Sequence, residues 1–211
     1  MKPFQSSAYA SLALLYCLAM LWVPFTGDAV IKALPIVYLA VLAWQNGVLG
    51  LTGALAISAV GDVLLAFDLF ELGLAAFLVA QLCYAALFAR QFEWRADRLA
   101  PALMLLLWCA ALLLLIVPVL GNLKLPVFAY LLAIVCMGLS ALFNRQSLWP
   151  GVAGAACFIV SDSLIALEMF TVALPAHGWA IMVTYYLAQW LLTQALIQSG
   201  RATQSSRMAF N

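Results

Sequence analysis

The sequence predicts an all-α membrane protein, a single domain over residues 1–211 that forms a polytopic bundle of eight transmembrane helices. Hydrophobic residues make up 68% of the chain and charged residues only 8%. A soluble domain carries about 25% charged residues, so these charges are too few to cover a surface that faces water. The apolar residues also fall into runs of about 20, the length that crosses a bilayer as a helix.

Short polar segments separate the apolar runs and set the limits of the expected helices. In chain order these are residues 9–25, 29–44, 50–67, 72–89, 99–120, 124–143, 149–170 and 178–198. No convincing small-residue cleavage site follows the first run, so we interpret it as a retained helix. Residues 199–211 are expected to form a polar, frayed tail, and the loops leave no room for a soluble domain.

Basic residues in the expected loops gather on one side of the membrane. An even number of helices places both termini on that side, together with Lys2, Arg90, Arg95, Arg98, Arg145, Arg201 and Arg207. The other side carries only Lys32 and Lys124. Cytoplasmic loops are enriched in Lys and Arg, so we predict that both termini are cytoplasmic.

Two segments of the chain read alike. Residues 61–70, Gly-Asp-Val-Leu-Leu-Ala-Phe-Asp-Leu-Phe, match residues 161–170, Ser-Asp-Ser-Leu-Ile-Ala-Leu-Glu-Met-Phe. Lysine and proline open the helix before each segment, and an Ala-Gln pair lies in the helix after it. This order predicts a four-plus-four parallel duplication, with halves at about 9–89 and 99–198.

Asp62 and Asp162 are the residues whose position most needs an explanation. Each is expected about 12 to 13 residues into its helix, near the middle of the membrane, where a charged group costs at least a few kcal/mol. Ala54, Ser58, Asp62 and Ala66 share one helix face, and this small-residue stripe would allow a second helix to pack closely over Asp62. The pair is either a functional site or a structural one, in which tyrosine or lysine satisfies each carboxylate.

Other polar side chains would accompany the aspartates. Gln81 and Tyr84 share a face of one helix, and Tyr185 and Gln189 share a face of another. These four residues either line a polar cavity and contact a substrate there or form hydrogen bonds between helices.

Lys32 and Lys124 are expected near helix ends on the side of the membrane toward which the aspartates lie. They either bind a lipid phosphate, pair with Asp68 and Glu168, or extend to the interface without a partner.

Several kinds of chemistry have no signature in this sequence. The single histidine, His177, excludes a zinc site with two or three histidines, and no P-loop or Gly-x-Ser-x-Gly motif occurs. The five cysteines form no C-x-x-C pair, and the net charge of +1 argues against nucleic acid as a partner. We therefore expect no metal and no cofactor, and acid–base chemistry would depend on carboxylates.

The order of these motifs resembles that of the YhhN/TMEM86 family from about the second helix to the eighth. The resemblance is carried by Lys32 with Leu34-Pro35, Gly61-Asp62, Ala80-Gln81 with Tyr84, Ser161-Asp162, and Tyr185-Tyr186 with Ala188-Gln189. Ala33 departs from the pattern, since the family often has proline directly after the lysine.

The resemblance implies lysoplasmalogenase activity, which is hydrolysis of the vinyl ether bond of a lysophospholipid to a fatty aldehyde and a glycerophospho-alcohol. It names Asp62 and Asp162 as the catalytic pair. Protonation of the vinyl ether at carbon needs an acid, and addition of water needs a base. Two carboxyl groups in a poorly solvated site supply both, since they do not readily ionise together.

Other functions are open at this point. A small transporter or channel would use the aspartates as proton or cation sites, and a lipid-binding scaffold would use them only for packing. We expect an integral protein of a bacterial cytoplasmic membrane, in contact with membrane lipid. The sequence says nothing of the oligomeric state.

Overall fold

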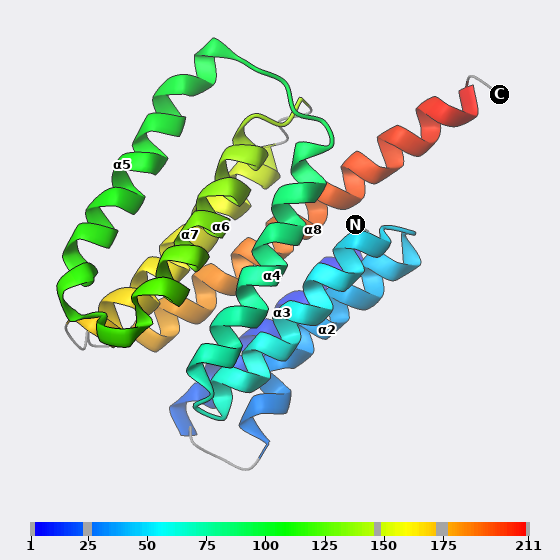
Figure 1. Cartoon of the computed structure of the whole chain (residues 1–211). Helices are drawn as coiled ribbons and strands as arrows, with labels where there is room; N and C mark the ends of the chain where they lie inside the picture. The colour runs from blue at the N-terminus through cyan, green and yellow to red at the C-terminus, as the bar shows by residue number, and fades with distance from the viewer. Residues whose placement is uncertain (1–2, 23–26, 146–148, 172–176, 210–211) are drawn as a thin grey trace.

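The structure is a computed structural model that describes residues 3–22, 27–145, 149–171 and 177–209, and in these residues it is all-helical (Figure 1). Its eight α-helices are α1 (Pro3–Ala19), α2 (Asp28–Gln45), α3 (Leu49–Ala66), α4 (Phe70–Ala89), α5 (Leu99–Ile116), α6 (Lys124–Leu142), α7 (Trp149–Phe170) and α8 (His177–Ala209). Short 3₁₀ turns extend α1 and flank α5 and α6. The predicted all-α class and the helix count are both confirmed.

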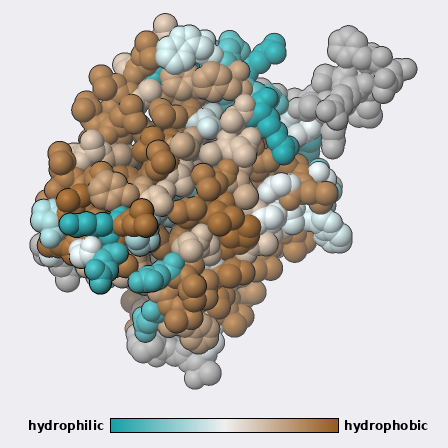
Figure 2. All heavy atoms as spheres, viewed as in Figure 1, coloured by the Kyte–Doolittle hydropathy of each residue, from teal (hydrophilic) through white to brown (hydrophobic). Residues whose placement is uncertain are grey.

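Seven of these helices, α2 to α8, are long and apolar enough to cross a membrane. The exception is α1, which has 17 α-helical residues, whereas a span needs about 20. Seven of the eight expected spans are therefore long enough by this measure, and α1 is a shorter apolar helix. Figure 2 shows that hydrophobic residues cover most of one face of the molecule. The chain is an integral membrane protein.

Two predicted boundaries were wrong at the ends of the chain. The first helix begins at Pro3 and not at residue 9. Its α-helical part ends at Ala19, and the end expected at residue 25 lies outside the described residues. The polar tail expected from residue 199 onward is helical as far as Ala209. A single glycine such as Gly200 costs a helix only about 1 kcal/mol, and Arg201 Nη2 donates a 2.7 Å hydrogen bond to Asn46 Oδ1, which fixes this part of α8 to the end of α2.

A third boundary differs at the end of α5. This helix was expected to reach residue 120, but it ends at Ile116 and continues as a 3₁₀ turn over Val117–Val119. Pro118 lies in the turn, and proline has no N–H to donate to the carbonyl four residues before it.

The helices pack unevenly. The extensive contacts are those of α7 with α8, α3 with α4, α2 with α3, and α4 with α6. Helix α5 lies at the edge of the bundle (Figure 1) and exposes large apolar side chains such as Leu103, Met104 and Leu114. The main buried cluster lies between the other helices and includes Leu39, Leu55, Phe158 and Leu192.

Two glycines allow the aspartate-bearing helices to approach their neighbours. A Cβ atom added at Gly154 of α7 would lie 2.9 Å from the backbone nitrogen of Leu192 in α8. One added at Gly61 of α3 would lie 2.8 Å from the ring of Phe77 in α4. Distances below 3 Å are not compatible with a Cβ atom unless something moves, so glycine at these positions sets the spacing of α3 from α4 and of α7 from α8.

We expect Gly154→Ala to lower the free energy of unfolding by about 1–3 kcal/mol, because the added methyl group forces two helix backbones apart. The measurement is the thermal midpoint of the purified protein in detergent. Gly53→Ala is the matched control, since nothing lies within 4 Å of a Cβ atom there and alanine favours a helix. Equal melting of the two variants would contradict this account of the contact between α7 and α8.

Candidate active site

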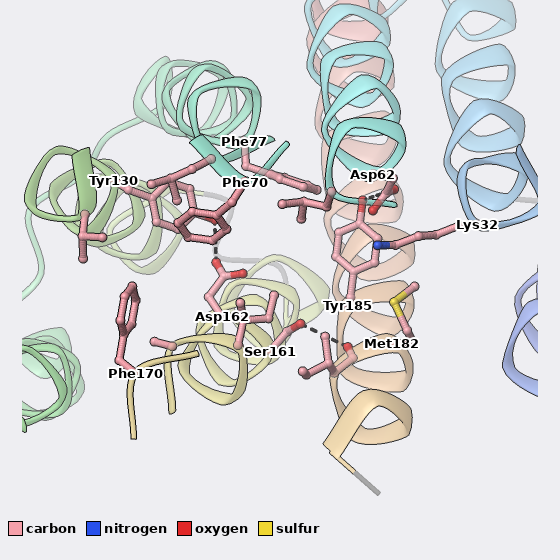
Figure 3. Close-up of a pocket in the computed structure, with 16 residues that line it drawn as sticks. Lys32, Asp62, Phe70, Phe77, Tyr130, Ser161, Asp162, Phe170, Met182 and Tyr185 are labelled. Atoms are coloured by element: carbon pink, nitrogen blue, oxygen red, sulfur yellow. Dashed lines mark hydrogen bonds between the residues drawn. The ribbon is translucent and has the colours of Figure 1, made fainter. Parts of the chain in front are cut away.

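Asp62 and Asp162 line the same cavity in the interior of the bundle (Figure 3). The cavity has a volume of about 100 Å³ and lies among α2, α3, α4, α6, α7 and α8. Its polar lining residues are Lys32, Asp62, Tyr130, Ser161, Asp162 and Tyr185. Its other walls are apolar. A molecule in this space would therefore meet two carboxyl groups and one ammonium group inside an otherwise apolar bundle.

The Asp62 carboxyl group is held by a chain of buried hydrogen bonds. Only 2% of this residue is exposed, and the Tyr185 hydroxyl donates to Asp62 Oδ2 over 2.8 Å. Gln189 Nε2 donates to the Tyr185 oxygen over 3.2 Å, and the Tyr84 hydroxyl donates to Gln189 Oε1 over 2.7 Å. Each donor in the chain points toward Asp62, so side chains of α4 and α8 fix a carboxyl group of α3.

The Asp162 carboxyl group has a different partner. The hydroxyl of Tyr130, on α6, donates to Asp162 Oδ2 over 2.8 Å. Asp162 is half-buried and points toward Tyr130 at the cavity wall (Figure 3). The neighbouring Ser161 hydroxyl donates to the Ile181 carbonyl over 3.1 Å and so fixes α7 to α8. Each aspartate thus has its own tyrosine, and the two tyrosines come from different helices.

Lys32 lies at the Asp62 end of the cavity. In Figure 3 its ammonium nitrogen points toward Tyr185 and Asp62. Its backbone carbonyl accepts a 2.8 Å hydrogen bond from the Tyr186 hydroxyl, which connects α2 to α8. The lysine is therefore anchored through its backbone while its charged group stays available to the cavity.

The second predicted lysine, Lys124, lies elsewhere. It begins α6, its side chain is exposed, and it is not among the residues that line the cavity. The two lysines were expected to have equivalent roles, but only Lys32 can meet a molecule bound beside the aspartates.

Three further residues expected to contact a substrate lie behind the cavity wall. Gln81, Tyr84 and Gln189 are fully buried and are not part of the lining. Tyr84 and Gln189 form hydrogen bonds between helices, which was the other interpretation open from the sequence. Neither polar side-chain atom of Gln81 has a hydrogen-bond partner within the described residues. Of the four polar residues on these two helices, only Tyr185 reaches the cavity.

Sequence reasoning missed Tyr130, although a signal was present. Tyr130 follows Lys124 at the same spacing at which Tyr38 follows Lys32, so this tyrosine belongs to the repeated pattern. Phe70 and Phe170, the last residues of the two similar segments, both line the cavity. The similarity between the two segments therefore marked these cavity residues, but no role had been assigned to them.

The arrangement is suited to proton transfer in an apolar environment. Two carboxyl groups on one cavity can act as acid and base, and tyrosine hydroxyls orient them. Within the described residues, no three His, Cys, Asp or Glu side chains gather closely enough to hold a metal ion.

Comparison with known proteins identifies the family. The family model of YhhN matches residues 27–196. This chain belongs to the YhhN family. The matched range includes every residue that lines the cavity, from Lys32 to Tyr185. Helix α1 and the last turns of α8 lie outside the match.

Three relatives of this chain are each named lysoplasmalogenase. Lysoplasmalogenase TMEM86B of Mus musculus is 34% identical over 195 residues, which cover 85% of this chain and 81% of the relative. Lysoplasmalogenase TMEM86A of Homo sapiens is 32% identical over 215 residues, covering 90% and 88%. A lysoplasmalogenase of Mycobacterium tuberculosis (strain CDC 1551 / Oshkosh) is 37% identical over 153 residues, covering 68% and 58%. No solved structure gives a significant match.

We expect Tyr185→Phe to destabilise the protein, because it removes the hydrogen-bond donor to Asp62 Oδ2 and the acceptor of Gln189 Nε2. Loss of one partner of a buried hydrogen bond costs about 1–3 kcal/mol, which the thermal midpoint in detergent will report. Tyr38→Phe is the control, since its bond to the Gln5 carbonyl is longer, 3.4 Å, and only partly buried. If Tyr38→Phe lowered the midpoint as much, the hydrogen-bond chain would not be the cause.

Proposed function

We propose that this protein is a lysoplasmalogenase that hydrolyses the vinyl ether bond of a lysophospholipid inside the membrane, with Asp62 and Asp162 as its catalytic residues. The observation that carries the proposal is the cavity shared by these two carboxyl groups. It agrees with relatives named lysoplasmalogenase that cover most of this chain. A lipid already in the bilayer can reach such a cavity without passing through water.

The first step of the proposed reaction is proton transfer to carbon. A carboxylic acid of the site gives its proton to the vinyl ether carbon that is farther from the oxygen. The double-bond electrons form the new C–H bond, and an oxocarbenium ion results. Its positive charge is spread over the other vinyl carbon and the ether oxygen, and the nearby carboxylate stabilises it electrostatically.

The second step adds water and separates the products. The other carboxylate accepts a proton from a water molecule while the water oxygen bonds to the cationic carbon, which gives a hemiacetal. The hemiacetal hydroxyl then gives its proton to the carboxylate left by the first step, and its O–H electrons form the carbonyl of the aldehyde. The C–O electron pair stays on the glycerol oxygen, which takes the proton that the second carboxyl group had accepted from water and leaves as the alcohol, so both carboxyl groups return to their starting states. One water molecule is consumed, and a fatty aldehyde and a glycerophospho-alcohol are released.

We also propose that α1, which its 3₁₀ turn extends to Trp22, crosses the membrane as an eighth span, so that both termini are cytoplasmic. The linker over residues 90–98 carries three arginines, and the Arg145 backbone N–H donates a 2.6 Å hydrogen bond to the Gln91 carbonyl of this linker. Arg201 donates a hydrogen bond to Asn46 at the end of α2. This concentration of positive charge favours the cytoplasmic side. The membrane that we propose is a bacterial cytoplasmic membrane, and one of the relatives is a bacterial protein.

The four-plus-four repeat remains part of the proposal. It is supported by the third helix of each half, which contributes one aspartate to the shared cavity. Phe70 and Phe170 stand at matching positions of the two halves and line the same space. Parallel repeats of this kind occur in other membrane proteins.

We expect purified protein in detergent to release fatty aldehyde from a lysoplasmenyl-ethanolamine, and Asp62→Asn or Asp162→Asn to lower kcat by about 100-fold or more, because each removes an acid–base group. Asp68→Asn should retain full activity. Asp68 is exposed and has a φ of 58°, a conformation that asparagine also tolerates. Full turnover by both cavity variants would rule out the carboxylate mechanism.

We expect Lys32→Gln to raise KM by about tenfold with a smaller change in kcat, because the lysine would bind the substrate phosphate and not the reacting atoms. Lys124→Gln is the matched control and should leave KM unchanged, since its side chain lies outside the cavity. Steady-state kinetics with the same substrate would separate these outcomes. Equal effects of the two substitutions would mean that the phosphate does not bind at Lys32.

A further inference from the structure

A second, apolar cavity lies next to the cavity that Asp62 and Asp162 line, which we call the aspartate cavity. It has a volume of about 50 Å³ and lies between α5, α6 and α7, where its walls include Cys109, Leu112, Ile134 and Ile159. The two cavities have Val127, Tyr130, Asp162 and Ala166 in common. Asp162 therefore stands at the boundary between a cavity with polar groups and one that is almost wholly apolar.

Helix α5 forms the wall of this apolar cavity at the edge of the bundle (Figure 1). The buried share of the α5 span is 17%, against 33–56% for the other spans, and the exposed large side chains of α5 are leucines, Met104 and Trp108. The Trp108 indole N–H of α5 donates a 3.0 Å hydrogen bond to the Ser163 hydroxyl of α7. A hydrocarbon chain that leaves the cavity past α5 would enter the bilayer without meeting a charged group.

The polarity of the lining decreases from the Lys32 end of the aspartate cavity to the apolar cavity. Lys32 and Asp62 lie at one end of the aspartate cavity, and Asp162 and Tyr130 lie at the other (Figure 3). A lysophospholipid has the same polarity, with an anionic phosphate at one end and a hydrocarbon chain at the other. We infer that the apolar cavity between α5, α6 and α7 receives the vinyl end of the substrate's alkenyl chain, the rest of which extends past α5 into the bilayer, and that this cavity sets the chain preference of the enzyme, an inference that rests on the proposed function.

This binding direction assigns a role to each aspartate. With the chain beside Asp162 and the phosphate beside Lys32, the chain-side carbon of the vinyl ether faces Asp162. Asp162 then donates the proton that forms the new C–H bond. The ether-bearing carbon faces Asp62, which accepts the proton of the attacking water.

Filling the apolar cavity tests the inference. Leu112→Trp places a larger side chain in the cavity, and Leu114→Trp makes the same change on the lipid-facing side of the same helix, where Leu114 is 76% exposed. The measured quantity is kcat/KM for a hexadecenyl substrate divided by that for a hexenyl substrate. We expect Leu112→Trp to lower this ratio about tenfold or more, and Leu114→Trp to leave it unchanged. An unchanged ratio in Leu112→Trp would overturn the inference.

A second variant acts in the opposite direction. Ile134→Ala enlarges the cavity at a residue that is 2% exposed. It should raise the relative kcat/KM of a methyl-branched chain a few-fold over that of the straight chain. No change in this preference would also count against the cavity as the chain site.

A labelling experiment separates failure of this inference from failure of the proposed function. The probe is a saturated 1-O-alkyl lysophosphatidylethanolamine with a diazirine in its chain, which the protein cannot hydrolyse. We expect the label on the segments around Leu112 and Ile134, with less of it in Leu112→Trp than in Leu114→Trp. Label on outward-facing residues such as Leu103 alone would overturn the inference, whereas cavity labelling without aldehyde release would refute only the proposed activity.

Discussion

The burial of the Asp62 carboxyl group in an apolar bundle is the constraint on which the rest of this structure depends. A carboxylate in such surroundings is costly unless hydrogen bonds satisfy it. The chain from Tyr84 through Gln189 and Tyr185 supplies those bonds and requires α3, α4 and α8 to stay within hydrogen-bond reach. Gly61 permits the close approach of α3 to α4, and Gly154 permits that of α7 to α8, since any larger residue would push a helix away. Packing and site geometry are therefore parts of one arrangement.

The two aspartates are alike in sequence but not in their surroundings. Asp62 accepts a hydrogen bond from Tyr185 of α8. Asp162 accepts one from Tyr130 of α6 and also adjoins an apolar cavity. In the proposed reaction this difference is useful, because the substrate is polar at one end and apolar at the other. Two equivalent aspartates could not distinguish the chain-side carbon of the vinyl ether from the carbon that carries the oxygen.

Much of the fold was predictable, because hydrophobic runs of membrane length leave few alternatives. The predicted limits of α2, α4, α6 and α7 lie within two residues of the observed limits. The helical end of α8 was not predictable from polarity, since a polar segment can continue a helix that packing has already begun. The sequence also identified Asp62 and Asp162 as a pair that one cavity brings together. The sequence did not show that Lys32 and Tyr185 line the cavity while Lys124 and Gln189 do not. Periodicity gives the helix face on which a side chain lies but not its neighbour across the bundle.

The central claim is that a fixed carboxylic acid in this cavity delivers a proton to one face of the vinyl ether carbon. The direct test is to run the hydrolysis in D₂O, reduce the aldehyde at once to the alcohol, and determine the configuration of the deuterium-bearing carbon next to the former carbonyl. Our account predicts one deuterium at that carbon, in a single configuration. A racemic label would contradict it, because the proton would then have come from water after the product had left the site.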